Sequence, residues 1–322
     1  MSKTRPLPQE LVTLAGTQRQ VLTGAQLRSE LPYHALRRAL AEQQVIKMWH
    51  GAYCLPAAVM TAGELANIGY DSAQTRVGAS RIRTVTRLTA AELTLSRPVT
   101  ACLNTAAELW RFAIDDDHQT HVLGAGPSIR AELVLHRTPP LDRVSRAYGF
   151  PVVGAPETAI RLAARADSPE RSLAILDAAL RSRFAPADLL CDAAGRLHIA
   201  GVERVRNLLP LADGRAESPG ESWLRWMCHD AGFPVPVAQF EVTCRGGARY
   251  RIDLAWPHLR LGLEYDGVEF HTGKALTRDR TRLNALTRAG WTIQSVTAPM
   301  LWAGRAQLVA ELREDLRLRG AL

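Results

Sequence analysis

Two short stretches late in the chain, residues 251–256 and 261–267, alternate apolar and polar side chains. Alternation with a period of two is typical of β-strands that are buried on one face only. Only residues 257–260 lie between the two stretches. The pattern therefore predicts an antiparallel hairpin, and such a hairpin needs further strands or helices to cover its apolar face.

The register of this hairpin follows from its loop. Either Trp256 lies opposite Leu261 or Pro257 lies opposite Arg260, and both choices give the same register. The apolar residues of both strands then form one face, with the facing pairs Ile252 and Tyr265, Leu254 and Leu263, and Trp256 and Leu261. A slip of one residue would scatter this apolar set. On the polar face, Asp253 lies directly opposite Glu264.

The facing carboxylates of Asp253 and Glu264 need a positive partner. Side chains paired in this way have Cβ atoms about 5 Å apart, and like charges there are destabilising. A divalent cation between them would relieve the repulsion, and Mg²⁺ binds carboxylate oxygens together with water and substrate phosphates. The alternative is a solvated surface, in which Arg251, opposite Asp266, and neighbouring basic residues neutralise the pair. Spacing alone leaves both interpretations open.

A third carboxylate, Glu221, begins a predicted helix upstream of the hairpin. Ser218 suits the N-cap, Pro219 suits the first turn, and Glu221 stands three residues after the cap, so the sequence predicts a capping box. Glu221 also shares one helical face with Leu224 and Cys228, at the spacing of a face that turns toward a core. Capping fully explains Glu221, and the same side chain is placed to reach the hairpin.

Further elements are predicted on both sides of the hairpin. A strand over residues 237–243 precedes it, and a helix that is capped by Thr277 and ends at Gly290 follows it. A strand over residues 291–297 and a helix over residues 299–319 complete the region. The order helix, strand, strand, strand, helix, strand, helix predicts a mixed α/β (α+β) domain.

Several motifs in the last third of the chain occur in a characteristic order: the Glu221 helix, Asp253, Glu264-x-Asp266-Gly, His271, Asp279-x-x-Arg282 and Gly290-Trp291. In this order and spacing they resemble the very-short-patch-repair-like branch of the PD-(D/E)XK endonuclease superfamily. The resemblance implies a restriction-endonuclease-like αβββαβ core and a hydrolase that cuts DNA, as in DNA repair. It also implies that Glu221, Asp253 and Glu264 hold Mg²⁺ (or Mn²⁺), because a metal activates water and neutralises charge on the phosphate.

One position departs from the superfamily pattern. Asp266 stands where a lysine usually stabilises the attacking hydroxide, and we keep it among the candidate catalytic residues. General acid or base chemistry is expected from His271, whose ordinary pKa of about 6.5 suits that role, although a histidine after a turn is more often a surface residue. Three helix arginines, Arg278, Arg280 and Arg282, are candidates for phosphate contacts or else for solvated surface charge.

The first sixty residues have a different pattern. Thr23 is expected to cap a helix over residues 24–29, a basic helix covers residues 33–43, and the alternating residues 45–55 turn at Gly51. This order is typical of a winged helix-turn-helix domain. It resembles the N-terminal domain of AbiEi-type abortive-infection antitoxins, which implies a transcriptional autorepressor that binds DNA and neutralises a partner toxin. On that resemblance, the expected DNA contacts are Arg37, Arg38, Lys47 and His50.

Composition bears on partners and location. The net charge of +8, from 40 basic and 32 acidic residues, favours a polyanionic partner such as DNA. The five cysteines are odd in number and widely spread, which predicts reduced thiols in the cytoplasm. The chain has neither the apolar core of a secretion signal nor an apolar run of about 18 residues, so no membrane span is expected.

Three domains are predicted: a winged helix-turn-helix domain over residues 1–60, a mixed α/β connecting domain over residues 61–213, and the endonuclease-like domain over residues 214–322. Residues 211–218 are polar and suit a linker. In the middle domain we expect a helix over residues 99–112, strands over residues 120–123 and 132–136, and two helices around Ser168. His121 and His136 are expected to be packed inside the strands, and residues 115–118 to form a solvated loop.

Three functional hypotheses remain. The first is a metal-dependent endonuclease whose N-terminal domain and basic surface hold DNA. The second is a non-catalytic DNA-binding regulator of the antitoxin type, in which the nuclease fold serves only for binding. Asp266 in place of lysine favours this second hypothesis. The third is a scaffold that binds a protein partner through the middle region. Separately, the N-terminal segment could be a small helical domain for protein contacts and not a DNA reader.

Overall fold

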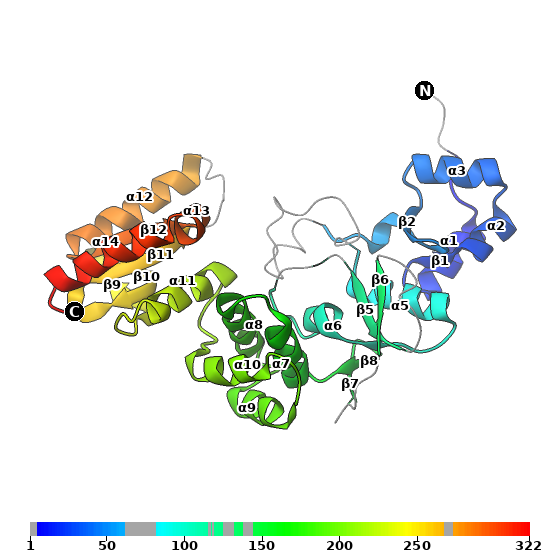
Figure 1. The fold of residues 1–322 in the computed structure, drawn as a ribbon. Helices are drawn as coiled ribbons and strands as arrows, with labels where there is room; N and C mark the ends of the chain where they lie inside the picture. Colours follow the sequence, from blue (N-terminus) through cyan, green and yellow to red (C-terminus); the bar gives the residue numbers. More distant parts are fainter. Residues whose placement is uncertain are drawn as a thin grey trace. The chain divides into compact units, whose positions relative to one another are not determined.

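The computed structural model describes residues 5–61, 82–114, 117, 119–124, 132–137, 144–266 and 273–322, with the backbone alone for residues 273–279. The chain folds as two compact units, residues 1–159 and 160–322 (Figure 1). Each unit combines helices with β-sheet, so the predicted mixed α/β class is confirmed. The division into three domains stays a prediction.

The first unit begins with a small helical and β-sheet segment. Its elements are α1 (Gln9–Thr17), β1 (Val21–Thr23), α2 (Gly24–Glu30), α3 (Tyr33–Ala41), β2 (Ile46–Trp49), β3 (Ala52–Cys54) and the 3-10 turn η1 (Pro56–Ala58). The strands form an antiparallel sheet in the order β1-β3-β2. The predicted cap is confirmed, because the Thr23 hydroxyl accepts a hydrogen bond from the Gln26 backbone N–H. The predicted turn at Gly51 is also confirmed, and its φ of +86° suits glycine.

A five-stranded sheet follows in the order β6-β5-β4-β8-β7. The elements are α5 (Thr84–Leu95), β4 (Thr100–Ala101), α6 (Leu103–Leu109), β5 (Thr120–Leu123), β6 (Leu133–His136), β7 (Val144–Ala147) and β8 (Phe150–Val153). The strands predicted at 120–123 and 132–136 are confirmed. The helix predicted over residues 99–112 is wrong at its start, because residues 100–101 pair with β5 and β8 before α6 begins. A short apolar run fits a strand and a helix equally well, and sheet pairing decided between them.

The N-terminal sheet shares its core with the rest of the first unit. One apolar cluster contains Val21 and Trp49 from the small sheet, Leu88 from α5 and Val152 from β8. The Trp49 indole also donates a hydrogen bond to the Thr94 hydroxyl over 2.9 Å. A second cluster, which includes Leu11, Leu27 and Leu36, fills the space between the first three helices. The first sixty residues are therefore packed directly on the following segment.

The two strand histidines are in contact. His121 is buried, as expected, and its Nδ1 lies 2.8 Å from His136 Nε2. Its Nε2 lies 2.6 Å from Asp117 Oδ2. Asp117 thus bonds to a strand histidine, whereas the predicted solvated loop at 115–118 falls mostly outside the described residues.

Helices α7 (Ala155–Arg165), α8 (Pro169–Ser182), α9 (Ala187–Arg196) and α10 (Val202–Leu208) lead into the second unit, and the 3-10 turn η3 (Leu209–Leu211) ends this series. Helix α7 crosses the division between the units. The two helices predicted around Ser168 are confirmed, and the Ser168 hydroxyl caps α8 by accepting from the Arg171 N–H over 3.4 Å.

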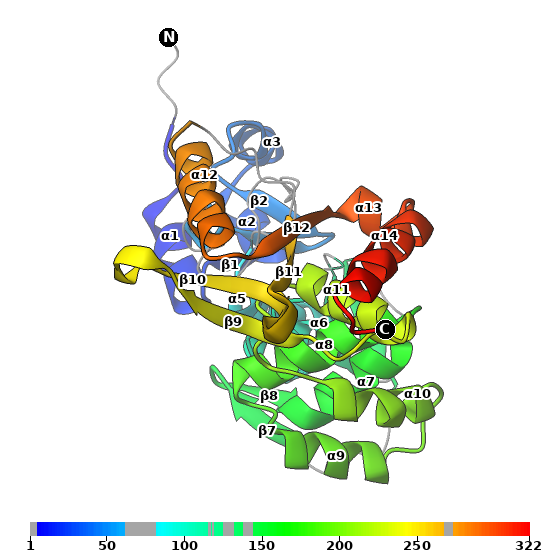
Figure 2. The same ribbon diagram turned by 90° about the vertical axis from the view of Figure 1, so that its left-hand side faces the viewer.

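The second unit contains a four-stranded sheet in the order β12-β11-β10-β9. Its elements are α11 (Pro219–Asp230), β9 (Val237–Thr243), η4 (Arg245–Gly247), β10 (Arg249–Trp256), η5 (Pro257–Leu259), β11 (Leu261–Asp266), α12 (Gly273–Arg288), β12 (Thr292–Thr297), α13 (Ala298–Trp302) and α14 (Arg305–Leu318). Strands β11 and β12 are parallel and the other pairs are antiparallel. Figure 2 shows α12 on one side of the sheet and α11 with α14 on the other.

The predicted element order of this region is confirmed, with two corrections. The last helix is broken into α13 and α14 around Gly304, where a Cβ would lie 3.3 Å from the Met300 backbone. Helix α12 begins at Gly273, so Thr277 lies inside the helix and does not cap it. Threonine and lysine are both accommodated inside helices. The cap predicted at Thr277 rested on the local sequence alone, and the helix begins earlier.

The predicted hairpin register is confirmed where the strands pair: Leu254 lies opposite Leu263 and Trp256 opposite Leu261. The single apolar face is wrong for Ile252. Leu254 and Trp256 pack with α11 and α14, whereas Ile252 packs with Leu286 of α12. Strands β9 and β10 pair regularly on both sides of Gln239 and Asp253, but these two residues do not form a pair themselves. Gln239 also has a φ of +53°. This irregularity redirects the side chains that precede it along β10.

The cysteines and helices bear on two further expectations. All five cysteines are free thiols, and Cys54, Cys102, Cys228 and Cys244 are buried. Burial raises the pKa of the Cys54 and Cys228 thiols to about 12, so both are inert core side chains. Within the described ranges, no helix has the length and apolar character needed to cross a membrane.

Candidate functional site

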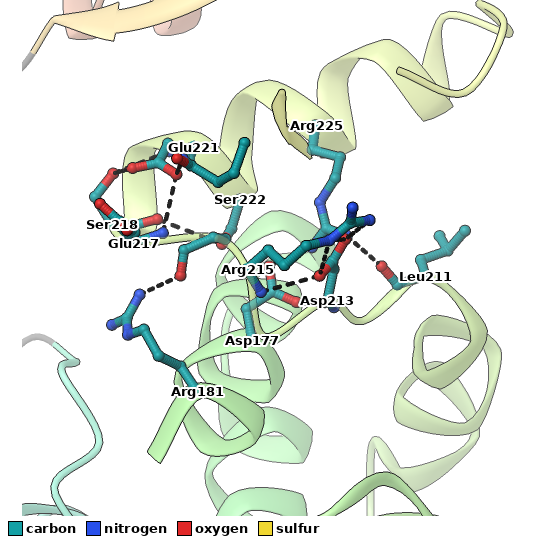
Figure 3. A network of polar contacts seen from close by, with 12 residues as sticks. Asp177, Arg181, Leu211, Asp213, Arg215, Glu217, Ser218, Glu221, Ser222 and Arg225 are labelled. Atoms are coloured by element: carbon teal, nitrogen blue, oxygen red, sulfur yellow. Dashed lines mark hydrogen bonds and ion pairs between the residues drawn. The ribbon is translucent and has the colours of Figure 1, made fainter. Parts of the chain in front are cut away.

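Glu221 lies at the first turn of α11, where the sequence predicts a cap. The Ser218 hydroxyl accepts from the Glu221 N–H over 3.3 Å and donates to Glu221 Oε1 over 2.9 Å. Glu221 Oε2 accepts from the Glu217 N–H over 2.9 Å, so the reciprocal bond of the predicted capping box goes to the residue before the cap (Figure 3). Glu221 is 8% exposed and shares its buried face with Leu224 and Cys228. The carboxylate is thus held in one orientation at the edge of the core.

Gln239 connects Glu221 to the hairpin. Its side-chain Nε2 donates to Glu221 Oε2 over 2.7 Å and lies 3.4 Å from Asp253 Oδ1. The other Asp253 oxygen, Oδ2, accepts from the Tyr265 backbone N–H over 3.0 Å. The Asp253 side chain therefore takes the place of a backbone acceptor for the Tyr265 N–H. The Gln239 amide lies between two carboxylates from different elements.

Negative charge is concentrated at this point. The pKa of Asp253 is raised to about 6, first by burial and then by the nearby charges of Glu221 and Glu264. The Tyr265 N–H and Arg282 act in the opposite direction but do not cancel the rise. A carboxyl group whose pKa is raised by burial and by other carboxylates is a typical mark of a functional site.

Glu264 faces a different partner. Arg282 of α12 donates to both of its oxygens, over 2.6 Å to Oε2 and also to Oε1, and donates to the Arg251 backbone oxygen over 2.6 Å. Glu264 is 12% exposed and Arg282 is 28% exposed. A bidentate guanidinium neutralises a carboxylate effectively. Arg282, expected at a phosphate, thus turns toward the sheet and holds the third predicted metal ligand.

The remaining predicted residues of this region have varied outcomes. Asp266 is exposed at the end of β11, and Arg280 is exposed on α12. Arg278 lies in α12, but its side chain falls outside the described part of the structure. His271 also lies outside the described residues. The structure therefore brings together Glu221 and Asp253 through Gln239, and pairs Glu264 with Arg282.

The predicted DNA contacts of the first unit are all exposed. Arg37 and Arg38 lie on the outer face of α3, whose inner face buries Leu36 and Ala39. The Arg37 guanidinium lies 6.0 Å from the centre of the Tyr33 ring. Lys47 lies on β2 and His50 at the turn to β3. These side chains are available to solvent.

Two proteins of Mycobacterium tuberculosis are similar to this chain. "Uncharacterized protein Rv2248" of strain ATCC 25618 / H37Rv is 36% identical over 234 residues, which cover 71% of this chain and 86% of the relative. "Uncharacterized protein MT2308" of strain CDC 1551 / Oshkosh gives the same values. The chain belongs to their family. No family model matches the chain, and the name of neither relative states an activity.

Helix α11, which carries Glu221, is held against α8 by a buried ion pair. Arg225 of α11 bonds to Asp177, whose side chain is 1% exposed, and donates to the Leu211 backbone oxygen over 2.6 Å. Asp177 also accepts from the Asp213 N–H over 2.8 Å (Figure 3). The predicted linker at 211–218 is therefore bound to α8 and fixes the position at which α11 begins.

The donor set can be compared with the needs of a divalent cation. Among the residues that the structure describes, no group of three or more His, Cys, Asp or Glu side chains could hold a metal ion. The oxygens of Glu221 and Asp253 nevertheless converge on one amide, and the buried Gln239 Oε1 accepts no hydrogen bond from a described residue. Carboxylate and amide oxygens are the donors that hard cations take. The Glu221–Asp253–Gln239 cluster, hereafter the carboxylate cluster, therefore fits Mg²⁺ or Mn²⁺ in its chemistry, while Glu264 is occupied by Arg282.

Sequence analysis did not identify two contacts of the candidate site. Gln239 is one polar residue in an alternating strand, and its spacing gives no signal of a role. The sequence predicts that Arg282 either contacts DNA phosphate or is solvated surface charge, and neither alternative includes its pairing with Glu264. The signal in the sequence was the number of carboxylates near Asp253, because such a group needs a cation or a hydrogen-bond donor between its members.

Proposed function

We propose that this protein is a DNA-binding, metal-dependent endonuclease that hydrolyses phosphodiester bonds. The observation that carries the proposal is the meeting of Glu221 and Asp253 at the Gln239 amide, with the Asp253 pKa raised to about 6. A site that gathers carboxylates at a cost in repulsion is suited to a cation and a phosphate. We also propose a cytoplasmic location, in agreement with the free cysteines.

The architecture of the second unit supports this proposal. The order α11, β9, β10, β11, α12, β12 agrees with the αβββαβ core expected from the resemblance to the PD-(D/E)XK endonucleases. Glu221, Asp253 and Glu264 come from the helix and the two hairpin strands that the resemblance requires. Fold alone does not determine function, so the proposal depends on the carboxylate cluster.

Each residue of the candidate site has a defined part in the proposed reaction. Glu221 and Asp253 would hold Mg²⁺ or Mn²⁺, which supplies an activated water and neutralises charge on the phosphate. The Ser218 cap and the Tyr265 N–H orient these two carboxylates beforehand. Arg282 neutralises Glu264. Glu264 would be a further oxygen donor for the cation only if Arg282 moved to another anion. Exposed Arg280 is suited to a backbone phosphate of the bound DNA.

The first unit is proposed to hold the DNA. The sequence of α1, β1, α2, α3, β2 and β3 with the sheet order β1-β3-β2 supports a winged helix, in which α3 enters a groove and the β2–β3 hairpin is the wing. Exposed Arg37, Arg38, Lys47 and His50 agree with this role, as does the net charge of +8. A protein that binds and cuts DNA makes use of both units.

The second candidate is a non-catalytic DNA-binding regulator of the antitoxin type, with a toxin as its protein partner. The specific observation in its favour is that Arg282 binds both oxygens of Glu264, which neutralises that carboxylate without a metal. The exposed carboxylate of Asp266, at the position expected for lysine, favours the same alternative. In this case the second unit would bind DNA or the partner without cleaving a bond.

Cleavage of a labelled DNA panel separates the two candidates. Purified protein would be incubated with duplex, nicked, mismatched and single-stranded DNA in Mg²⁺, Mn²⁺ or EDTA. Glu221→Gln and Asp253→Asn test the carboxylate cluster, and Glu314→Gln, at an exposed position on α14, is the matched control. Metal-dependent cleavage that both cluster variants lose and the control keeps supports the nuclease. DNA binding with no cleavage by the wild type supports the regulator instead.

A further inference from the structure

Gln239 occupies an unusual backbone position. It lies inside β9, yet its φ of +53° is in the left-handed region, which few residues other than glycine adopt. The ladder to β10 pairs Phe240 with Ile252 and Ala238 with Leu254, but records no pair between Gln239 and Asp253. Unfavourable conformations of this kind persist where the surrounding structure holds them, and they are concentrated at functional sites.

The two ends of the Gln239 amide are used differently. Nε2 donates to Glu221 Oε2 over 2.7 Å and lies within 3.4 Å of Asp253 Oδ1, so one NH₂ group serves both carboxylates. Oε1 is buried from solvent, and no described residue donates to it. Buried carbonyl-type oxygens are almost always hydrogen-bonded, by protein or by an ordered water. We therefore expect a donor at Oε1, next to the two carboxylates.

Other side chains would not serve both purposes. A leucine at this position would leave the carboxylates of Glu221 and Asp253 without a donor between them. A glutamate would offer oxygens only and add a third negative charge. An amide supplies a donor on one atom and an acceptor on the next, so it can hold two carboxylates together and still bind a water.

We propose that Gln239 is the positioning residue of the carboxylate cluster: its Nε2 sets the spacing of Glu221 and Asp253, and its Oε1 accepts a hydrogen bond from a water that hydrates a divalent cation held there. This inference rests on the proposed metal-dependent function and assigns a role within it. Partners that orient metal ligands in this way typically change metal affinity by about 10- to 100-fold when they are removed.

Binding of Mn²⁺ alone to the full chain tests the role directly. Isothermal titration calorimetry would compare the wild type with Gln239→Leu and with Gln294→Leu. Gln294 on β12 is a matched control, because its Oε1 is also buried without a described donor, but no hydrogen bond to Glu221, Asp253 or Glu264 is present among the described contacts. We expect Gln239→Leu to weaken Mn²⁺ binding at least about tenfold and Gln294→Leu to change it less than about twofold.

A second variant keeps the test valid if Gln239→Leu folds poorly. Gln239→Glu should have a lower Tm than the wild type in EDTA, because three carboxylates then meet without a donor. Saturating Mn²⁺ should raise its Tm by more degrees than it raises that of the wild type. A purely structural role of Gln239 would lower the Tm equally with and without Mn²⁺.

The outcomes separate this inference from the proposed function. If the wild type binds Mn²⁺ and cuts DNA while Gln239→Leu does both equally well, the role of Gln239 is refuted and the nuclease stands. A Gln239→Glu variant that responds to Mn²⁺ no more than the wild type refutes it as well. If the wild type neither binds Mn²⁺ nor cuts DNA, the nuclease and the role of Gln239 fail together.

Discussion

Arg282 of α12 holds both carboxylate oxygens of Glu264 on β11, across 18 residues of sequence. The same arginine donates to the Arg251 backbone oxygen, so it joins the helix to both strands of the hairpin. Its charge also lowers the pKa of Asp253, although burial and the neighbouring carboxylates outweigh it. One guanidinium thus neutralises Glu264 and offsets part of the repulsion at Asp253.

Arg282→Ala should destabilise the protein in the absence of metal. Glu264 would lose its bidentate partner while largely buried, and we expect a loss of about 2 to 4 kcal/mol in the free energy of unfolding. Chemical denaturation in EDTA measures this loss, with Arg288→Ala as the control on an exposed position of the same helix. If Glu264 is a metal ligand, Mn²⁺ should restore part of the stability of Arg282→Ala. Equal stability of the two variants would contradict the importance of the pair.

The pKa of Asp253 predicts how stability varies with pH. Because the folded-state pKa of about 6 exceeds the ordinary value, the folded protein binds the proton more tightly than the unfolded chain. The contribution of Asp253 to stability is therefore present at low pH and is lost as pH rises from about 4 to about 6. Asp253→Asn removes this loss and should be more stable than the wild type above pH 6, by on the order of 2 kcal/mol.

Unfolding curves between pH 4 and pH 8 in EDTA would show the effect of Asp253. The difference between Asp253→Asn and the wild type should grow with pH and then level off. Glu314→Gln, at an exposed position, is the control and should follow the wild type across the range. A constant difference at every pH would mean that repulsion at Asp253 is not its source.

Asp177 should be essential for stability. Its side chain is 1% exposed and binds Arg225, which is 11% exposed, so Asp177→Ala removes the nearer anion of a buried guanidinium and leaves only Asp213, 3.9 Å away. We expect a loss of about 3 to 5 kcal/mol in the free energy of unfolding. Asp167→Ala is the control, because its ion pair with Arg171 is exposed and should be worth less than about 1 kcal/mol. Denaturant titration of both variants measures the contrast.

Gly220 is required by close packing at the start of α11. A Cβ at this position would lie 2.1 Å from the ring of Tyr265, so Gly220→Ala should move either α11 or β11 and cost about 1 to 3 kcal/mol. At Gly195, in α9 of the same unit, nothing lies within 4 Å of an added Cβ. Gly195→Ala should therefore be neutral or stabilising by up to about 1 kcal/mol. Thermal unfolding of the two variants tests the pair.

Arg37 and Arg38 should contribute to DNA affinity. Both are exposed on α3, and loss of a phosphate contact weakens binding at every sequence and flattens its dependence on salt. We expect Arg37→Ala with Arg38→Ala to reduce the salt slope by about 1 to 2. Fluorescence anisotropy at several salt concentrations measures this slope, with Arg317→Ala on α14 as the control. An unchanged slope would place the DNA elsewhere on the protein.

Local patterns in the sequence determined much of the fold. The caps at Thr23 and Ser218 act within a few residues, so the helix starts at Gly24 and Pro219 were predictable. The hairpin register was predictable because a slip of one residue exchanges the two faces of a strand. The same logic failed at Ile252, where an irregularity opposite Gln239 redirects the side chain, and such irregularities carry no periodic signal.

The candidate site was predicted in its acidic residues but not in their partners. Asp253 and Glu264 were identified because facing carboxylates need a compensating group. Glu221 was identified as a capping residue on an inward helical face, and the resemblance to the PD-(D/E)XK endonucleases joined the three as a site. Gln239 between two of them and Arg282 on the third were decided by tertiary structure. These contacts join residues 18 positions apart on separate elements, and any donor of the right length could have filled either place. The packing of β9 and α12 on the hairpin determines that Gln239 and Arg282 are the side chains that donate to these carboxylates.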